Sequence, residues 1–148
     1  MSRDYKRAAD SSAPWTDEAA RAFLVEAFAD LFDPNNDALD TAKKYMTPDY
    51  LQLVDGAMLD FEGFVNHLEV LHSSLSRAEF TFETVIASGN TISDIHIVDA
   101  VKKDGSTLRT KVIAFYHMRG EQIEKIDELT HMLEGDIEDG DLGSRISR

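Results

Sequence analysis

The sequence has no cysteine, only three prolines and a shortage of positive charge. Without cysteine, disulfides, thiolate metal sites and cysteine nucleophiles are all excluded. The 148 residues hold 15 basic and 28 acidic side chains, so the formal net charge is -13. Such a surface repels phosphate backbones and anionic lipid headgroups. We therefore expect neither nucleic acid nor a membrane as a partner.

Long hydrophobic runs are also missing. Residues 1–14 contain no apolar stretch typical of a signal peptide, and no segment approaches the length of a transmembrane helix. We therefore expect a soluble, cytoplasmic protein. The hydrophobic content of 43% is enough for one core, and the length fits one domain. We predict a flexible arm at 1–14, a single domain at 15–134 and a flexible acidic tail at 135–148.

The first half of the chain is predicted to be mainly helical. Apolar residues recur there at spacings of three and four, which is typical of helices with one buried face. The predicted helices span 18–32, 38–45 and 61–75. Between the second and third, Asp55-Gly56 is a tight-turn dipeptide that favours a short hairpin.

The second half is rich in β-forming residues separated by tight-turn dipeptides. The predicted strands span 79–87, 92–103, 107–119 and 122–133. Asp104-Gly105 fits a two-residue type I′ turn, and Gly120-Glu121 fits a type II′ turn. Long strands joined this way form an antiparallel meander, which must twist and coil. The predicted fold is α+β: a cone-shaped barrel of a curved antiparallel sheet, with three helices from the N-terminal half covering a pocket.

This order of elements resembles that of nuclear transport factor 2-like proteins. The resemblance covers about residues 17–133 and is carried by FLVEAFADLF, TPDYLQLVDGAMLDFEGFVNHLEVLH and IHIVDAVKKDG…IAFYHMRGEQIEKIDELT. The chain is most similar to the SnoaL-like branch, which includes polyketide cyclases and lies near ketosteroid isomerases. Its ending, DELT…GD…DLGSR, resembles bacterial members of that branch. The resemblance implies a deep pocket and frequent dimers through the outer sheet face, but the fold hosts many activities.

The two turns predict which strand residues share a face. If each turn has two residues, His96 lies opposite Ile113, and Ile113 lies opposite Glu128. One face then combines apolar walls with a few polar groups, as a ligand pocket requires. Its predicted members are Asp94, His96, Val98, Ile113, Phe115, Ile126, Glu128 and Thr130.

We predict that His96, Asp94 and Glu128 are catalytic. Imidazole titrates near neutrality, so His96 suits a general acid or base, with Asp94 orienting its ring. Burial is expected to raise the pKa of Glu128 toward that of a useful acid. The predicted ligand-binding residues are Tyr50, Val98, Ile113, Phe115, Ile126 and Thr130. The alternative is a satisfied polar cluster that serves no ligand.

The opposite face is predicted to form a homodimer, because monomers rarely expose a large apolar patch. Its predicted members are Ile95, Ile97, Val112, Ala114, Tyr116 and Leu129. Tyr116 reaches the pocket only if the register differs from this one. His67 and His72 lie five positions apart on a predicted helix and so do not share a face, and we expect no metal site.

Three functions remain open from the sequence. The first is an isomerase, cyclase or dehydratase that needs no cofactor and acts on a small hydrophobic carbonyl compound. The second is a non-catalytic module that binds a small molecule or a protein partner. The third is a purely structural dimer. A pocket in which every ionisable group is paired with another would favour the second.

Overall fold

The computed structural model describes residues 13–139. The predicted arm at 1–12 and the end of the predicted tail at 140–148 lie outside the described residues. The helices are α1 (Asp17–Leu31), α2 (Ala38–Tyr45), α3 (Phe61–Ser74) and a 3-10 turn, η1 (Ile137–Asp139). The strands are β1 (Met46–Val54), β2 (Ala57–Asp60), β3 (Leu75–Ser88), β4 (Thr91–Lys102), β5 (Thr107–Arg119) and β6 (Gln122–Glu134).

The strands form one curved sheet in the order β2-β1-β6-β5-β4-β3. The predicted α+β fold with a curved sheet and three helices is confirmed. The sheet differs from the prediction in two respects: β1 pairs with β6 in parallel, and the sheet is not closed into a barrel. Since α3 and four strands separate β1 from β6 along the chain, no hairpin forces these two strands to be antiparallel.

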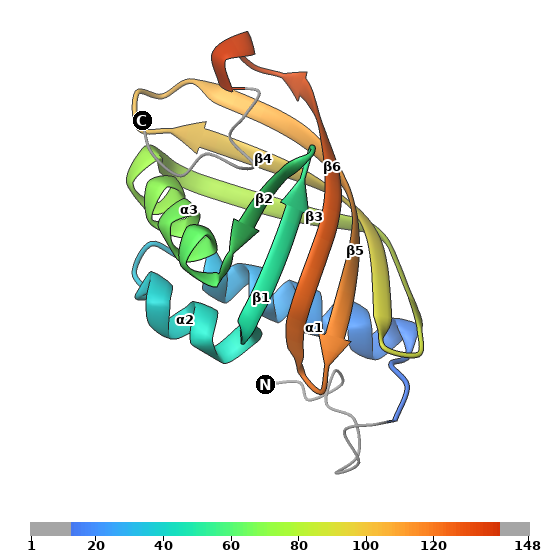
Figure 1. Ribbon diagram of the computed structural model, residues 1–148. Coiled ribbons are helices and arrows are strands. Elements are labelled where there is room, and N and C mark those ends of the chain that lie inside the picture. The colour runs from blue at the N-terminus through green and yellow to red at the C-terminus, as the bar shows by residue number, and fades with distance from the viewer. Residues whose placement is uncertain (1–12, 140–148) are drawn as a thin grey trace.

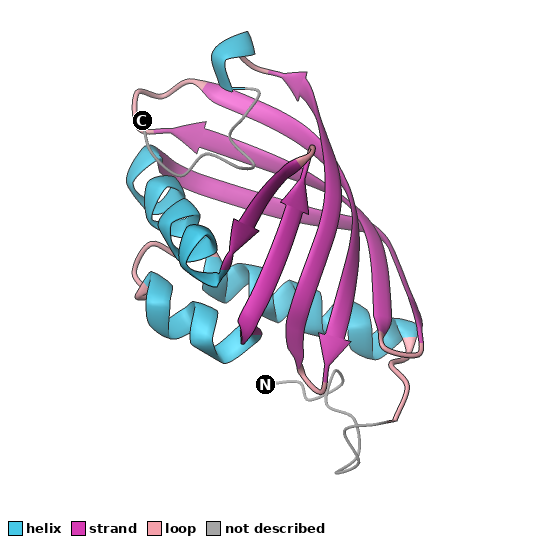
Figure 2. Ribbon diagram, in the orientation of Figure 1, coloured by secondary structure: helices cyan, strands magenta, loops and turns pink. Residues whose placement is uncertain are grey.

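The three helices gather on the inner side of the curved sheet (Figure 1). Helix α3 contacts both β2 and β3, the two strands at the open edges, and therefore lies across the gap that the sheet leaves. The strands bend around the helices, as the colouring by secondary structure shows (Figure 2). This arrangement buries the apolar helix faces against the inner face of the sheet. No helix among residues 13–139 is long and apolar enough to cross a membrane.

Local capping explains where the helices begin. The Oγ1 atom of Thr16 accepts a hydrogen bond from the backbone N–H of Ala19 at 3.0 Å, at the start of α1. At the start of α3, Oδ1 of Asp60 accepts a hydrogen bond from the backbone N–H of Gly63 at 2.8 Å. Trp15 is buried, with its ring 5.3 Å from that of Phe23, so the chain is already packed just before α1.

The predicted register between β4 and β5 is wrong by one residue. His96 lies opposite Val112 instead of Ile113. The N–H of Lys102 donates to the carbonyl of Ser106 at 2.8 Å, so the loop between them has three residues instead of two. Gly105 has φ 90, the left-handed conformation that such a loop needs. A slip of one residue turns every side chain of β5 to the other face.

A second shift occurs between β5 and β6. The two-residue turn at Gly120-Glu121 is confirmed, because Arg119 pairs with Gln122. However, the register shifts between His117 and Met118, so Glu128 lies opposite Ala114 instead of Ile113. The two shifts cancel on β6. Glu128 therefore stays on the same sheet face as Asp94, as predicted. On β5, which lies between them, each side chain points to the face opposite to the predicted one.

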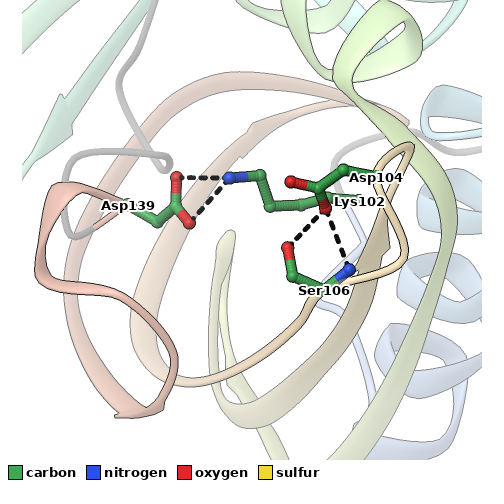
Figure 3. A network of polar contacts seen from close by, with 4 residues as sticks. All are labelled: Lys102, Asp104, Ser106 and Asp139. Atoms are coloured by element: carbon green, nitrogen blue, oxygen red, sulfur yellow. Dashed lines mark hydrogen bonds and ion pairs between the residues drawn. The ribbon is translucent and has the colours of Figure 1, made fainter.

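The described part of the predicted tail packs against the domain. Asp139, in η1, is buried, and both its carboxylate oxygens accept hydrogen bonds from Nζ of Lys102 at 3.0 and 3.2 Å (Figure 3). This bond raises the pKa of Lys102 above its ordinary value. In the same view, Ser106 binds Asp104 within the β4–β5 loop. The packed structure therefore continues past residue 134, where we had placed its end.

Candidate functional site

A cavity of about 120 Å³ lies between the inner sheet face and helices α1 and α3. Most of its wall is apolar. Among the described residues that line it, none is lysine or arginine, and the polar groups are few. Those groups are Gln52, His67, His96, Thr110, Glu128, Thr130 and Asp139. The cavity therefore suits a small, uncharged, mainly apolar molecule.

His96 and Asp94 form a buried pair beside the cavity. They lie two positions apart on β4, so their side chains point to the same face. Nδ1 of His96 is 2.7 Å from Oδ2 of Asp94, and the O–H of Tyr116 donates to the other oxygen, Oδ1, at 3.0 Å. With Asp94 accepting on both oxygens, Nδ1 of His96 carries the hydrogen. Its second nitrogen, Nε2, is left as an acceptor.

Aromatic rings enclose the imidazole of His96. The ring centroids of Phe28, Phe82 and Phe80 lie 5.2, 5.3 and 6.1 Å from that of His96. His96 itself lines the cavity, whereas Asp94 does not. Because Asp94 occupies Nδ1, Nε2 is the ring nitrogen left to meet a ligand.

Glu128 belongs to a second, partly buried network that also contains Tyr50 and Gln52. The O–H of Tyr50 donates to Oε1 of Gln52 at 2.7 Å, and Nε2 of Gln52 donates to Oε1 of Glu128 at 3.0 Å. Burial raises the pKa of the Glu128 carboxyl from its ordinary value of 4.5 to about 8, although the bond from Gln52 lowers it. Burial also raises the pKa of Tyr50 well above its ordinary value. Both groups are therefore uncharged at neutral pH.

The cross-strand register relates the two networks. Asp94, Ala114 and Glu128 form one row across three strands, and His96, Val112 and Thr130 form the next row. Since neighbouring strands are about 4.8 Å apart, the outer members of a row are separated by about 10 Å. The imidazole and the carboxyl therefore lie on strands two apart, with β5 between them.

The structure places some predicted site residues at the cavity and others away from it. Val98, Ile126 and Thr130 line the cavity together with His96 and Glu128. Tyr50 is fully buried and reaches the site only through Gln52. The roles of all these residues in binding or catalysis remain predictions.

Two of the predicted ligand-binding residues are wrong. Ile113 and Phe115 lie on the outer face, 47% and 50% exposed, because the three-residue loop turns β5 over. For the same reason Val112, Ala114 and Tyr116, which we assigned to the dimer face, are buried on the inner face. We expected Tyr116 to reach the pocket only if the register differed from the predicted one. The register does differ, and the O–H of Tyr116 donates to Asp94 on the inner face.

Sequence reasoning missed Gln52 and His67. Gln52 lies two positions from Tyr50 on β1, so the alternation of the strand could have placed both side chains on one face. His67 is buried and lines the cavity, with its ring 6.3 Å from that of Phe64 on α3. It lies one position before Leu68, on the apolar face of the helix. That position in the sequence could have predicted that His67 is buried. No group of three or more His, Asp or Glu among residues 13–139 is arranged to hold a metal ion.

Chemically, the cavity combines a hydrogen-bond acceptor with a donor. Nε2 of His96 is suited to accept a proton, and the uncharged carboxyl of Glu128 is suited to give one. The surrounding wall is apolar, which strengthens both interactions by excluding water. Groups in these states permit proton transfer to and from an uncharged ligand.

The arrangement of strands and helices is similar to that of several solved structures. A protein from Jannaschia sp. CCS1, assigned as a SnoaL-like polyketide cyclase, matches with a TM-score of 0.57 and 18% identity, over 74% of this chain and 85% of that chain. A nuclear transport factor 2-like protein from Exiguobacterium sp. 255-15 matches with a TM-score of 0.62 and 13% identity, over 72% and 97%. A protein from Catenulispora acidiphila DSM 44928 with a ketosteroid isomerase-like fold matches with a TM-score of 0.59 and 13% identity, over 71% and 82%.

No family model matches the sequence. A curated protein of fission yeast, Schizosaccharomyces pombe, is however 36% identical over 125 residues, which cover 84% of this chain and 95% of that protein. It is the uncharacterized protein C11D3.04c, so it adds no activity. The chain therefore has the nuclear transport factor 2-like fold seen in the SnoaL-like branch, as predicted, and belongs to the same family as C11D3.04c.

Proposed function

We propose that this protein is a cofactor-independent isomerase or dehydratase that acts on a small, uncharged carbonyl compound. One observation carries the proposal: an Asp94-bound imidazole and an uncharged carboxyl, Glu128, border the same apolar cavity. In this proposal His96 is the base, Glu128 is the acid and Asp94 positions the imidazole. Val98, Ile126 and Thr130 contact the ligand, and Tyr50 acts through Gln52. The expected cytoplasmic location remains a prediction.

The proposed reaction begins with enolisation. Nε2 of His96 takes a proton from the carbon next to the ligand's carbonyl group, and Glu128 gives its proton to the carbonyl oxygen. In a ligand with a double bond between its β and γ carbons, the resulting dienol returns its hydroxyl proton to Glu128 while the imidazolium protonates the γ carbon, which moves the double bond to the α and β carbons. If the ligand carries a hydroxyl group at the β carbon, that proton goes to the hydroxyl instead, and water leaves. Both routes restore His96 and Glu128.

Cyclohexanone is a suitable probe for this chemistry. An apolar cavity of similar volume takes benzene, so a six-membered ring is an appropriate size. In D₂O, enolisation replaces the hydrogens next to the carbonyl with deuterium, and proton NMR follows the loss of their signal. We expect the protein to accelerate this exchange and His96→Gln to abolish the acceleration. His131→Gln, a substitution at an exposed position of β6, is the matched control and should retain the rate.

The alternative function gives a different result. A non-catalytic binding module would bind cyclohexanone without accelerating exchange, and His96→Gln would then leave the slow rate unchanged. That outcome contradicts the proposed enzyme while keeping a ligand cavity. If His96→Gln instead lowers the stability of the protein and affects no ligand, the ionisable groups are a satisfied cluster.

We also propose that two copies associate through the outer sheet face. Ile95, Ile113 and Leu129 are cross-strand partners in one row, and Phe115 lies beside them on β5. Of these, Ile113, Phe115 and Leu129 are 47%, 50% and 66% exposed. An apolar patch that spans three strands is rarely left in water. Light scattering at micromolar concentration should therefore report twice the chain mass.

Substitutions in the patch provide the test of this association. Phe115→Asp is expected to convert the dimer to a monomer, because two copies would bring the new charges into an apolar contact. Asn66→Asp, at an exposed position of α3 and so away from the outer sheet face, is the control. A wild-type protein that scatters as a monomer at all accessible concentrations contradicts the dimer.

A further inference from the structure

We propose that the Tyr50–Gln52 pair is a positioning device that keeps the proton of Glu128 on the oxygen facing the cavity, so the site selects ligands that carry a hydrogen-bond acceptor. This inference rests on the proposed function and specifies its ligand. Gln52 donates to Glu128, and Tyr50 acts on Glu128 through Gln52; neither takes part in the proton transfers of the proposed reaction.

Tyr50 determines the orientation of the Gln52 amide. Tyr50 is fully buried, so its hydroxyl hydrogen needs an acceptor inside the protein. Oε1 of Gln52 is that acceptor, at 2.7 Å. With the amide oxygen held by Tyr50, the amide nitrogen is the atom that points to Glu128, and it donates to Oε1 at 3.0 Å.

The position of the Glu128 proton follows from that orientation. An oxygen that accepts a hydrogen bond from an N–H group does not direct its own hydrogen along the same line. The proton of the neutral carboxyl therefore resides on Oε2. Glu128 borders the cavity, and its Oε1 atom is occupied by Gln52, so Oε2 is the atom left to meet a ligand. A ligand atom there must accept a hydrogen bond.

The two sides of the cavity then have different requirements. Glu128 donates and His96 accepts, while the remaining wall offers mainly apolar contact. An oxygen placed near Glu128 satisfies the buried donor, whereas a hydrocarbon of the same shape leaves it unpaired at a cost in affinity. The expected ligand class is an uncharged ketone, aldehyde or enone, with its oxygen toward β6 and its adjacent carbon toward β4.

Two molecules of the same shape test this selection. Cyclohexanone carries the acceptor, and methylenecyclohexane replaces its oxygen with a CH₂ group. The measured quantity is the ratio of their dissociation constants, determined by NMR titration at pH 6.5, where Glu128 is protonated. Because both probes fill the same cavity, general damage to the cavity alters both constants and largely cancels in the ratio.

Four variants give distinct expectations. Glu128→Leu removes the donor and should lower the preference for cyclohexanone about tenfold. Glu128→Gln should keep the preference, because Gln52 then holds the new amide oxygen and leaves its N–H₂ group facing the cavity. Tyr50→Phe frees the Gln52 amide to turn over and accept the Glu128 proton, so the preference should fall severalfold. Tyr45→Phe, which removes a buried hydroxyl outside the cavity, should leave the ratio unchanged.

The outcomes separate this inference from the proposed function. If neither probe binds the wild-type protein, the proposed ligand cavity fails and this inference fails with it. If both bind, but Tyr50→Phe keeps the full wild-type ratio in a folded protein, the positioning device is refuted while the cavity stands. A loss of preference in Glu128→Gln refutes the orientation assigned to the amide. Amide NMR spectra establish that each variant is folded.

Discussion

The two polar networks of the inner sheet face contain the same kind of acid in different surroundings. Asp94 accepts one hydrogen bond on each oxygen, from His96 and Tyr116. Glu128 receives one bond from the neutral amide of Gln52, and burial raises its pKa to about 8. One carboxyl is thus surrounded by donors and the other is not. The same sheet face thus carries one carboxyl that accepts on both oxygens and another whose pKa burial raises to about 8.

Each state suits the role proposed for it. A carboxylate that accepts from His96 holds the imidazole with Nε2 free to take a proton. A carboxyl that stays protonated can give a proton to a carbonyl oxygen. The raised pKa of Glu128 has burial as its main cause, and the single bond from Gln52 opposes that shift only in part.

The largest effect is expected from Asp94→Asn. Tyr116 needs an acceptor and should hold the new amide oxygen, so the amide nitrogen would face His96. The imidazole would then accept at Nδ1 and carry its hydrogen on Nε2, where the proposed base must be unprotonated. Cyclohexanone exchange should fall about 10²- to 10⁴-fold, while binding persists. Nitrogen chemical shifts of the ring report the tautomer, and an unchanged tautomer with full exchange would disprove this role.

The next effect concerns the pH dependence of stability. In the folded protein Glu128 keeps its proton up to about pH 8, whereas in the unfolded chain it loses it near 4.5. The protonated carboxyl of Glu128 therefore stabilises the folded state fully below about pH 4.5, and this stabilisation is lost as the pH rises to about 8. Across that window the free energy of unfolding should fall by up to about 1.4 kcal/mol per pH unit relative to Glu128→Gln.

Urea unfolding of wild type and Glu128→Gln, at a series of pH values, measures this difference. Every other titrating group is common to both proteins, so its contribution cancels. If the two stability curves run parallel from pH 5 to 8, Glu128 is ionised in the folded state, and the contrast with Asp94 disappears.

The smallest effects are expected from the two tyrosines. Tyr116→Phe removes a hydrogen bond to a carboxylate and should cost about 2 kcal/mol, since bonds to charged groups are the stronger class. Tyr50→Phe removes a bond to a neutral amide and should cost about 1 kcal/mol. Chemical denaturation compares the two directly. Equal losses of unfolding free energy would mean that Asp94 and Gln52 are equally strong acceptors and would contradict this prediction.

The sequence predicts the elements of the fold well, because apolar spacing and turn dipeptides are local signals. The limits of β5 match the prediction, and those of α2 do as well. The parallel pairing of β1 with β6 had no such signal, since it joins residues far apart in the chain. For that reason Gln52 could not be linked to Glu128 in advance.

The candidate site could be predicted only where it did not depend on turn length. Asp94 and His96 share a face because they alternate on one strand, whatever the register. The predicted faces of Ile113 and Phe115 depended on the length of the β4–β5 loop. The loop has three residues instead of two, so both side chains lie on the other face. A second irregularity arises at Glu124, which is skipped in the register between β5 and β6; its side chain accepts a hydrogen bond from Nε of Arg119 at 2.9 Å. Glu128 was placed on the inner face because these two errors cancelled.

A direct titration of the Glu128 carboxyl is the most decisive measurement. The protein would carry carbon-13 at the side-chain carboxyl of glutamate, and Glu128→Gln would identify the signal of this residue. The account predicts a carbon chemical shift that changes with a midpoint of about 8 in the free protein. A midpoint near the ordinary value of 4.5 would mean that Glu128 is charged at neutral pH. It could then neither give a proton to a ligand nor select an acceptor, and the proposed chemistry would be wrong.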